Sequence, residues 1–441
     1  MAEATFTFPQ GFIWGTATSA HQVEGNNDNN NWTTWEQKGH IIDGSTAGRA
    51  CDWWGGKWRH DFDRAADGNQ NAHRLSIEWS RIQPEPNRWN ENALDHYRQM
   101  LQGLNERGLI PMVTLHHFTH PIWLEERGGW ENEDIVASFD RFVRKAVPAL
   151  AEYCDLWCTI NEPNVFAVSG YLLGTFPPGK KDLRAVYQVL VNMLKAHGAA
   201  YHAIHEIQPH ASVGMAHHYR GFSPARQRSP FDRWAANVIF QSFNHAIPQT
   251  LQTGVFHFFG RKTQIPAVKD CQDFFGLNYY TREFVAFNIF TPGELFTRRF
   301  YDPGAELSPT GFIANEPEEF FQALKWANRF QLPIFVTENG IEDNIDTLRP
   351  KYIIQHIHQM WRGVNYTWPI KGYFHWSLVD NFEWERGWTQ RFGLWELDCD
   401  TQERRKRKSA DLYKAICKEN AISSPTVREF APDLAADMFP G

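Results

Sequence analysis

Eight short apolar runs, separated by longer segments, are the feature that most constrains the fold of this chain. The runs are rich in Ile, Val, Leu, Phe and Thr, and they read as strands that are buried on both faces of a parallel sheet. They cover residues 12–16, 72–77, 110–115, 156–160, 212–216, 274–277, 334–337 and 372–376. A strand of this kind is the central element of an α/β fold.

The segments between the runs have the three-and-four spacing of amphipathic helices. Leu94, Tyr97, Leu101 and Leu104 follow this spacing between the second and third runs, and Gly108 closes the segment. Strands that alternate with helices pair in parallel through right-handed crossovers, and eight such strands close into a barrel. We therefore predict an α/β fold, a single (β/α)8 TIM barrel with its active site at the C-terminal ends of the strands.

The length of the chain is compatible with one domain. Barrels of this type often run longer than an average domain, and no linker rich in Gly, Ser or Pro divides the 441 residues. We predict a single domain over residues 1–441. Residues 421–441 form a C-terminal extension that is either laid over the barrel or partly disordered. Residues 219–231 and 282–317 have little helical pattern and are predicted to be irregular loops that wall the site.

Composition and charge exclude several classes of protein. A net charge of −7 argues against nucleic acid as a partner, and the basic run at residues 403–408 is interpreted as the solvated start of a helix. No run of eighteen apolar residues predicts a membrane span, and the N-terminus does not resemble a secretory signal peptide. We therefore expect a cytoplasmic protein with six free, mostly buried cysteines. No feature of the sequence indicates an oligomeric state.

Carboxylates directly follow two of the predicted strands. Glu162 follows residues 156–160 in the motif NEP, and Glu338 follows Thr337 in the motif VTENG. A single glutamate at such a position is more often an ion-paired loop residue, but here two matching positions occur. Other polar or aromatic side chains lie at or near the ends of the runs: Gln22, Arg74, His117, Asn278, Tyr280 and Trp376. Because the active site of such a barrel lies at these ends, the pattern predicts a polar cleft.

Paired carboxylates across a polar cleft suit the cleavage of glycosidic bonds. One carboxyl protonates the leaving oxygen, and the other attacks the sugar or activates water. An arginine such as Arg74 near Glu338 would keep this carboxylate ionised, as a nucleophile requires. Glu162 has no such partner in the sequence pattern, and we expect it to keep the raised pKa of a general acid.

The motifs in this order resemble those of glycoside hydrolase family 1, the β-glucosidase family of retaining enzymes, from Phe8 to about Asn420. The similar segments are GFIWGTATSAHQVEG, NAHRLSIEWSRIQP, TLHHF, TINEP, FFGLNYYT, VTENG and GYFHWSLVDNFEW. The resemblance implies that Glu162 is the acid/base and Glu338 the nucleophile, with Arg74, Tyr280 and Asn278 in support. The residues that it implies for sugar binding are Gln22, His117, Asn161, Trp376, Glu383 and Trp384.

The resemblance also implies an activity. We expect a retaining, exo-acting β-glycosidase that works by double displacement through a covalent glycosyl-enzyme intermediate. A β-glucosidase is expected first, with β-galactosidase or β-fucosidase side activity, because Glu383 and Gln22 can hold either epimer at C4. Its partners would be β-linked glycosides or short oligosaccharides. The mechanism needs no cofactor and no metal, and the three histidines His116, His117 and His120 have no carboxylate at ligand spacing beside them.

Three alternatives stay open at this point. A transglycosidase would use the same intermediate and pass the sugar to another hydroxyl. A 6-phospho-β-glycosidase is disfavoured because Glu383 would repel a phosphate. A non-catalytic sugar-binding barrel is disfavoured because both carboxylates are present. The chain departs from the family pattern at Phe118 and Thr119 and over residues 304–312, where no platform for the aglycone can be assigned.

Overall fold

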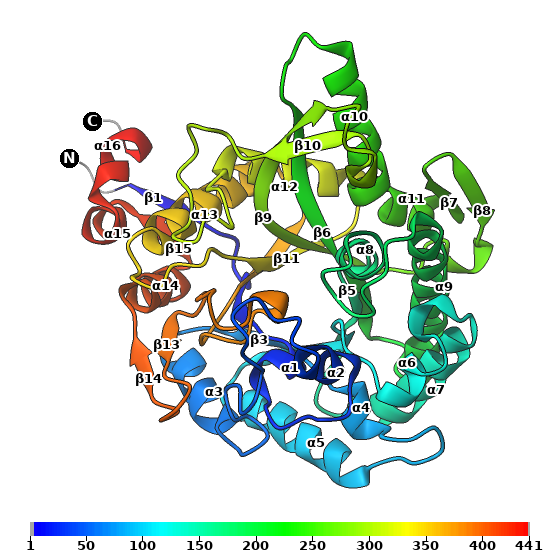
Figure 1. Cartoon of the computed structure of the whole chain (residues 1–441). Coiled ribbons are helices and arrows are strands. Elements are labelled where there is room, and N and C mark those ends of the chain that lie inside the picture. Colours follow the sequence, from blue (N-terminus) through cyan, green and yellow to red (C-terminus); the bar gives the residue numbers. More distant parts are fainter. Residues whose placement is uncertain (1–3, 440–441) are drawn as a thin grey trace.

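A closed barrel of parallel strands forms the centre of the computed structural model, which describes residues 4–439 (Figure 1). Its strands are β2 (Ile13–Ala17), β3 (Ala72–Ser76), β4 (Ile110–His116), β5 (Leu156–Asn161), β6 (Ser212–Pro224), β9 (Phe274–Phe287), β11 (Ile334–Asn339) and β12 (Ile370–His375). They pair in the order β9-β11-β12-β2-β3-β4-β5-β6, and β6 pairs with β9 to close the ring. All eight predicted strands and the predicted (β/α)8 barrel are confirmed.

Helices surround this barrel (Figure 1). The longer ones are α3 (Trp58–Asp67), α5 (Glu91–Asn105), α7 (Asp134–Leu150), α9 (Leu183–Ile207), α10 (Pro230–Phe240), α11 (Ala246–Thr253), α12 (Pro317–Ala327), α13 (Arg349–Asn365) and α14 (Lys408–Glu419). The shorter ones are α1 (Ala20–Val23), α2 (Asn31–Gln37), α4 (Trp79–Ile82), α6 (Ile122–Glu125), α8 (Pro163–Val168), α15 (Ser424–Phe430) and α16 (Ala435–Met438). No helix within residues 4–439 is both long enough and apolar enough to cross a membrane.

Two large hydrophobic clusters fill the layer between the barrel and the helices. In one, side chains of α5, α7 and α9 pack with those of β4 and β5, and the apolar stripe predicted for α5 is fully buried. In the other, side chains of α12, α13 and α14 pack with those of β9 and β11. Burial of apolar surface in these clusters is the main force that holds each strand end in place.

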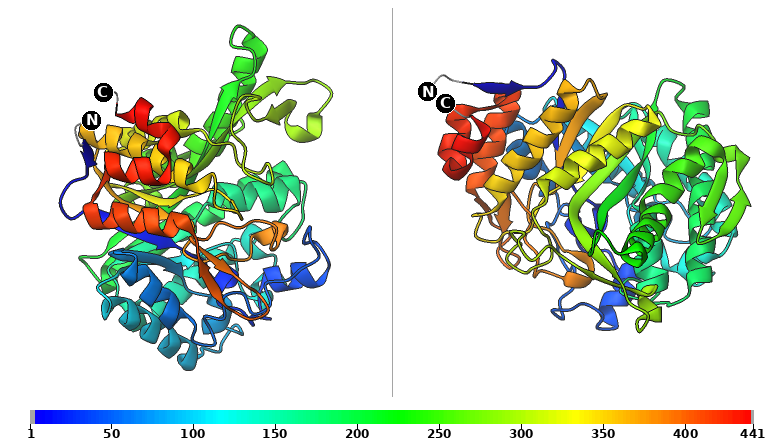
Figure 2. Two further views of the ribbon diagram at one scale, coloured as in Figure 1. Left: turned by 90° about the vertical axis from the view of Figure 1, so that its left-hand side faces the viewer. Right: turned by 90° about the horizontal axis from the view of Figure 1, so that it is seen from above.

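The two predicted irregular loops contain regular structure. Residues 221–224 of β6 pair in parallel with residues 282–285 of β9, and β10 (Thr297–Phe300) adds an antiparallel edge. Figure 1 and the left view of Figure 2 show this ribbon and α10 extending beyond the barrel. The prediction of purely irregular loops is therefore wrong. Several residues of the extension are half-buried, so it lacks the continuous apolar run of a strand that is covered on both faces.

The first and last described segments of the chain lie side by side (Figure 2). β1 (Thr5–Thr7) pairs antiparallel with β15 (Ala421–Ser423), and the ring of Phe6 stacks on that of Phe439, with centroids 4.8 Å apart. Residues 421–439 of the C-terminal extension thus contain β15, α15 and α16, while residues 440 and 441 lie outside the described part of the chain.

The basic run at residues 403–408 is partly buried. Residues Arg404–Lys406 form β14, which pairs with β13 (Trp395–Leu397). Arg407 donates to both carboxylate oxygens of Asp380 at 2.7 and 2.9 Å, and both side chains are buried. Arg404 pairs in the same way with the buried Asp61. The predicted solvated helix start is therefore wrong for these two arginines, which serve as internal counter-charges.

Substitution of the buried arginine tests this role. Arg407→Ala leaves the Asp380 charge buried without its main partner, and we expect the free energy of unfolding to fall by about 3–5 kcal/mol. Arg405→Ala, a matched change at an exposed position of the same run, should stay within about 0.5 kcal/mol of the parent protein. Denaturant unfolding of both variants gives the comparison, and equal losses would contradict the assigned role of Arg407.

Candidate active site

Both candidate carboxylates lie where the sequence predicts, at the C-terminal ends of barrel strands. Glu338 is the second-to-last residue of β11, and Glu162 directly follows β5. Both side chains are buried, with 4% and 6% of their residue surface exposed. Two carboxyl groups held so far from water need specific partners, because an isolated buried charge is strongly unfavourable.

Arg74 is the main partner of Glu338. It points from β3 into the barrel, is fully buried, and donates from Nη1 to a carboxylate oxygen of Glu338 at 2.6 Å. The Tyr280 hydroxyl donates to the other oxygen at 2.7 Å. Arg74 is itself fixed, because Nη2 donates to Asn161 Oδ1 at 2.6 Å and Nε donates to Thr114 Oγ1 at 3.1 Å. Glu338 is therefore held in one orientation from two sides.

Glu162 has a different set of partners. Asn278 donates from Nδ2 to Glu162 Oε1 at 2.8 Å, and Nδ1 of His218 lies 2.7 Å from the same oxygen. The backbone of Glu162 is in the left-handed region, with φ of 44°, as the chain turns from β5 directly into α8. A non-glycine residue in this region is strained, and such strain is often found at functional sites.

The two carboxylates belong to one hydrogen-bonded network. Asn161 Oδ1 accepts from Arg74 and, at 3.2 Å, from Asn278. Arg74 contacts Glu338, and Asn278 contacts Glu162. A continuous chain of charged and amide groups therefore connects both carboxylates inside the barrel mouth.

His218 is a member of this site that the sequence analysis missed. The predicted strand ended at residue 216, whereas β6 continues past it to Pro224. Alternate residues of a strand share a face, so His218 points into the barrel with Ala216 while His217 packs outward on Phe275. Extension of the predicted strand by two residues would have revealed this side chain. His218 is 5% exposed, and its Nε2 has no hydrogen-bond partner within residues 4–439.

The environment shifts the pKa values of the two carboxyl groups in opposite directions. Burial raises the pKa of Glu338 to about 7, and the nearby Glu162 adds to this rise, while Arg74 and Tyr280 oppose it. Burial also acts to raise the pKa of Glu162, but His218 and Asn278 outweigh it and hold this pKa below its ordinary value. The sequence predicts the reverse distribution. The sequence analysis included Arg74 but neither the depth of Glu338 nor His218, and the hydrogen-bonded network makes the two carboxyl groups titrate as a pair.

Gln22 and Glu383 lie together at one side of the site. Gln22 donates from Nε2 to the carbonyl oxygen of Phe382 at 2.7 Å and to Glu383 Oε2 at 3.2 Å. Burial raises the pKa of Glu383 well above its ordinary value, and Glu385 adds to this rise. The pair presents an amide and a carboxyl group, which suit the hydroxyl groups of a sugar.

His117, Trp376 and Trp384 form an aromatic wall beside this pair. The ring of His117 lies 5.9 Å from that of Trp384 and 6.0 Å from that of Trp376. Its Nε2 is 3.0 Å from Nδ2 of Asn161, so the wall is tied to the carboxylate network. All the residues that the sequence analysis singled out for the site therefore lie at one end of the barrel.

The three neighbouring histidines of the segment after β4 have separate environments. His117 contacts Asn161, His116 accepts from Trp130 Nε1 at 3.1 Å, and His120 lies 2.7 Å from a carboxylate oxygen of Glu125. Each ring thus has its own protein partner. Phe118, one of the departures from the family pattern, packs against Trp384 with ring centroids 5.0 Å apart.

Comparison with known proteins agrees with this geometry. The model of glycosyl hydrolase family 1 matches residues 4–422. β-Glucosidase A of Thermotoga maritima is 30% identical over 94% of this chain and 98% of its own length. The β-galactosidase of Sulfolobus acidocaldarius is 31% identical over 94% of this chain and 96% of its own. The solved structure of a β-glycosidase from Pyrococcus horikoshii matches with a TM-score of 0.91 at 36% identity, covering 97% of this chain and 98% of that one.

Proposed function

The chain belongs to glycosyl hydrolase family 1 and is a retaining β-glycosidase, and we propose that it acts from the non-reducing end of β-glucosides. The observation that carries this proposal is the pair of buried carboxylates at the ends of β5 and β11, each with its own hydrogen-bond donors. One carboxylate is positioned by a permanent cation, and the other by a histidine and an amide. This asymmetry suits two different roles in one reaction.

Glu338 is assigned as the nucleophile. Its carboxylate attacks the anomeric carbon while the bond from that carbon to the glycosidic oxygen breaks, and a covalent glycosyl-enzyme results. Glu162 gives its proton to the departing oxygen. It then takes a proton from water, which attacks the anomeric carbon and releases Glu338. Arg74 and Tyr280 hold the nucleophile, since their hydrogen bonds favour its ionised form.

His218 supports Glu162 in both of its protonation states. When Glu162 is ionised, Nδ1–H of His218 donates to it. When Glu162 carries the proton, the other tautomer of the ring accepts from it at Nδ1. The acid/base must change its protonation state between the two steps of the reaction. A partner that serves either state keeps the carboxyl group in place throughout.

The sugar is assigned to the side of the site that holds Gln22 and Glu383. A carboxyl and an amide group can bind the hydroxyl at C4 in either orientation, which supports β-galactosidase and β-fucosidase side activity beside the main β-glucosidase activity. A 6-phospho-sugar is less suited, because its phosphate would meet the Glu383 carboxyl. A transglycosidase would share every residue named here and differ only in the acceptor. A cytoplasmic location stays a prediction from the sequence.

Hydrolysis of a panel of 4-nitrophenyl glycosides tests the proposed function. We expect turnover of the β-glucoside, weaker turnover of the β-galactoside and β-fucoside, and none of the α-glucoside or the 6-phospho-β-glucoside. NMR should detect β-glucose as the first product, because two successive inversions retain the configuration. Release of α-glucose first, or a folded protein without activity on any β-glycoside, would contradict the proposal.

Removal of the assigned nucleophile gives a sharper test. Glu338→Ala should lose roughly 10⁴-fold or more in turnover, since no covalent intermediate can form. Added azide should restore turnover of the 4-nitrophenyl β-glucoside and yield the α-glucosyl azide, which NMR identifies. Glu319→Ala, which removes a carboxyl group on α12 outside the site, should neither lose activity to this extent nor respond to azide. Azide-independent activity of Glu338→Ala would show that another group is the nucleophile.

The pH profile follows from the paired titration. At pH values between the lowered pKa of Glu162 and the pKa of about 7 for Glu338, the two carboxyl groups share one proton. The first step of the reaction uses this proton on Glu162. We therefore expect kcat/KM to fall as the pH rises through about 7, where this proton leaves. Tyr280→Phe removes a hydrogen bond that favours ionised Glu338, so the pair should keep its proton to higher pH.

The falling limb of kcat/KM in Tyr280→Phe should accordingly move to higher pH. Tyr201→Phe on α9, whose hydroxyl donates to Asp273 outside the site, provides the matched control and should leave the limb in place. A limb that moves to lower pH in Tyr280→Phe, or that moves equally in both variants, would refute the assigned pairing.

A further inference from the structure

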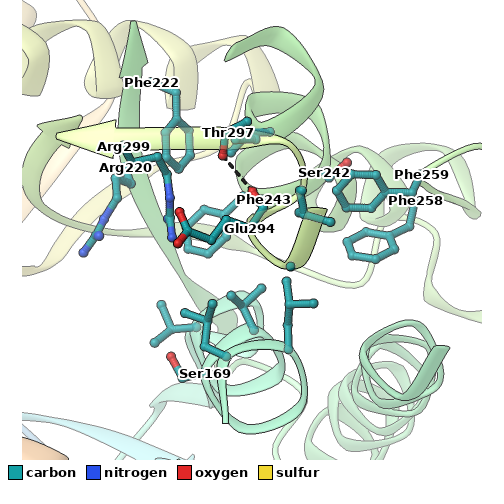
Figure 3. Close-up of a pocket in the computed structure, with 17 residues that line it drawn as sticks. Ser169, Arg220, Phe222, Ser242, Phe243, Phe258, Phe259, Glu294, Thr297 and Arg299 are labelled. Atoms are coloured by element: carbon teal, nitrogen blue, oxygen red, sulfur yellow. Dashed lines mark hydrogen bonds between the residues drawn. The ribbon is translucent and has the colours of Figure 1, made fainter. Parts of the chain in front are cut away.

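An apolar pocket lies next to the assigned acid/base, between α8 and the ribbon of β6, β9 and β10 (Figure 3). It encloses a cavity of about 130 Å³. Phe222 and Phe243 form one wall, and Phe258 and Phe259 close one end. None of the residues that the sequence analysis assigned to the site lines this pocket, so it is separate from them.

The opposite wall is an apolar stripe on one side of a helix. Val165 and Val168 of α8 and Leu172 and Leu173 of η2 (Ser169–Leu173) follow the three-and-four spacing of a single helical face. All four are only half-buried, whereas Phe166 and Ala167 on the other side of α8 are fully buried. The core thus takes one face of this helix, and the second apolar face is left to line the pocket.

The pocket is connected to the reacting groups through one side chain. The ring of Phe243 lies 5.9 Å from that of His218, and Nδ1 of His218 lies 2.7 Å from Glu162. Val165 lies in the first turn of α8, three residues after Glu162. Apart from Asn161, which ends β5, the sugar-binding candidates come from segments that follow β2, β4 and β12. The pocket is lined by β6 and by segments that follow β5, β6 and β9. It therefore lies beside Glu162 and away from most of the sugar-binding candidates.

The lining is mostly apolar, and two of its charged side chains are paired or exposed: Arg299 donates to Glu283 at 3.5 Å, and Glu294 is exposed to solvent. Arg220 donates to Glu283 at 3.1 Å, and Thr297 donates its hydroxyl to the carbonyl oxygen of Glu294 at 2.8 Å (Figure 3). Ser169 and Ser242 contribute two further hydroxyls. The many hydroxyl groups of a second sugar would lose their hydrogen bonds to water here and find too few replacements, which is unfavourable.

We infer that this pocket binds an apolar aryl or alkyl end of the aglycone, so that the preferred substrates are β-glycosides of apolar alcohols rather than β-linked oligosaccharides. A dry apolar cavity of about 150 Å³ is known to hold a benzene molecule, so a cavity of this size accepts one ring or a short alkyl chain. This inference rests on the proposed function, because it names the leaving group for the same two carboxylates.

The test is kcat/KM for methyl, butyl, hexyl and octyl β-glucoside, each below its micelle-forming concentration, with cellobiose beside them. Burial of each methylene should raise kcat/KM by up to about fourfold until the pocket is filled. We expect octyl β-glucoside to exceed both methyl β-glucoside and cellobiose. A flat series, or a higher value for cellobiose than for octyl β-glucoside, would overturn the inference.

Two matched variants tie the effect to the pocket. Leu172→Asn makes the wall polar while it keeps the number and branching of the side-chain heavy atoms, and it should lower the octyl-to-methyl ratio of kcat/KM at least several-fold. Leu183→Asn changes another half-buried helix leucine, at the start of α9 and outside the pocket, and should keep the parental ratio. An unchanged ratio in Leu172→Asn would contradict the inference, and if that variant does not fold, the series on the parent protein decides.

Failure of the inference and failure of the proposed function give different results. If the chain is not a β-glycosidase, the parent protein hydrolyses neither 4-nitrophenyl β-glucoside nor any member of the alkyl series. If only the pocket assignment is wrong, 4-nitrophenyl β-glucoside is hydrolysed and the alkyl series shows no gain with length.

Discussion

The buried guanidinium of Arg74 is the group on which the site depends. A permanent charge at the centre of a barrel is tolerated only when it is fully compensated, and Glu338 and Asn161 supply that compensation at 2.6 Å each. These contacts connect β3, β5 and β11 across the barrel interior. The same requirement that stabilises the charge therefore fixes the proposed nucleophile and the amide network that leads to Glu162.

The two sides of the cleft differ in chemistry. Gln22 and Glu383 offer an amide and a carboxyl group beside an aromatic wall, as a sugar ring requires. On the other side of Glu162, the stripe of Val165, Val168, Leu172 and Leu173 offers apolar surface. The proposed acid/base lies at the boundary between them, where a glycosidic oxygen joins a polar sugar to its aglycone. His218 connects the two regions, since it contacts both Glu162 and Phe243.

The sequence was sufficient for the barrel and for the positions of both carboxylates, because strands buried on two faces leave continuous apolar runs with polar ends. It was insufficient wherever the position, pKa or ion pairing of a side chain depends on segments that are distant in the sequence. His218 was missed because the apolar run stops at Ala216, although the strand stays buried through Tyr219. The pKa shifts followed from burial that no local pattern reports. Arg404 and Arg407 looked like a solvated run because their partners, Asp61 and Asp380, are far away in sequence. The pocket combines five segments of the chain.

Trapping of the covalent intermediate tests the central claim most directly. A 2-deoxy-2-fluoro-β-glucoside with a good leaving group slows both steps, but it lets the first outrun the second, so the glycosyl-enzyme accumulates. Peptide mass spectrometry of the trapped protein should find the fluoroglucosyl group on Glu338 alone, and its formation should coincide with loss of activity. A label on Glu162 or on any other residue, or a fully inhibited protein with no covalent label, would contradict the account.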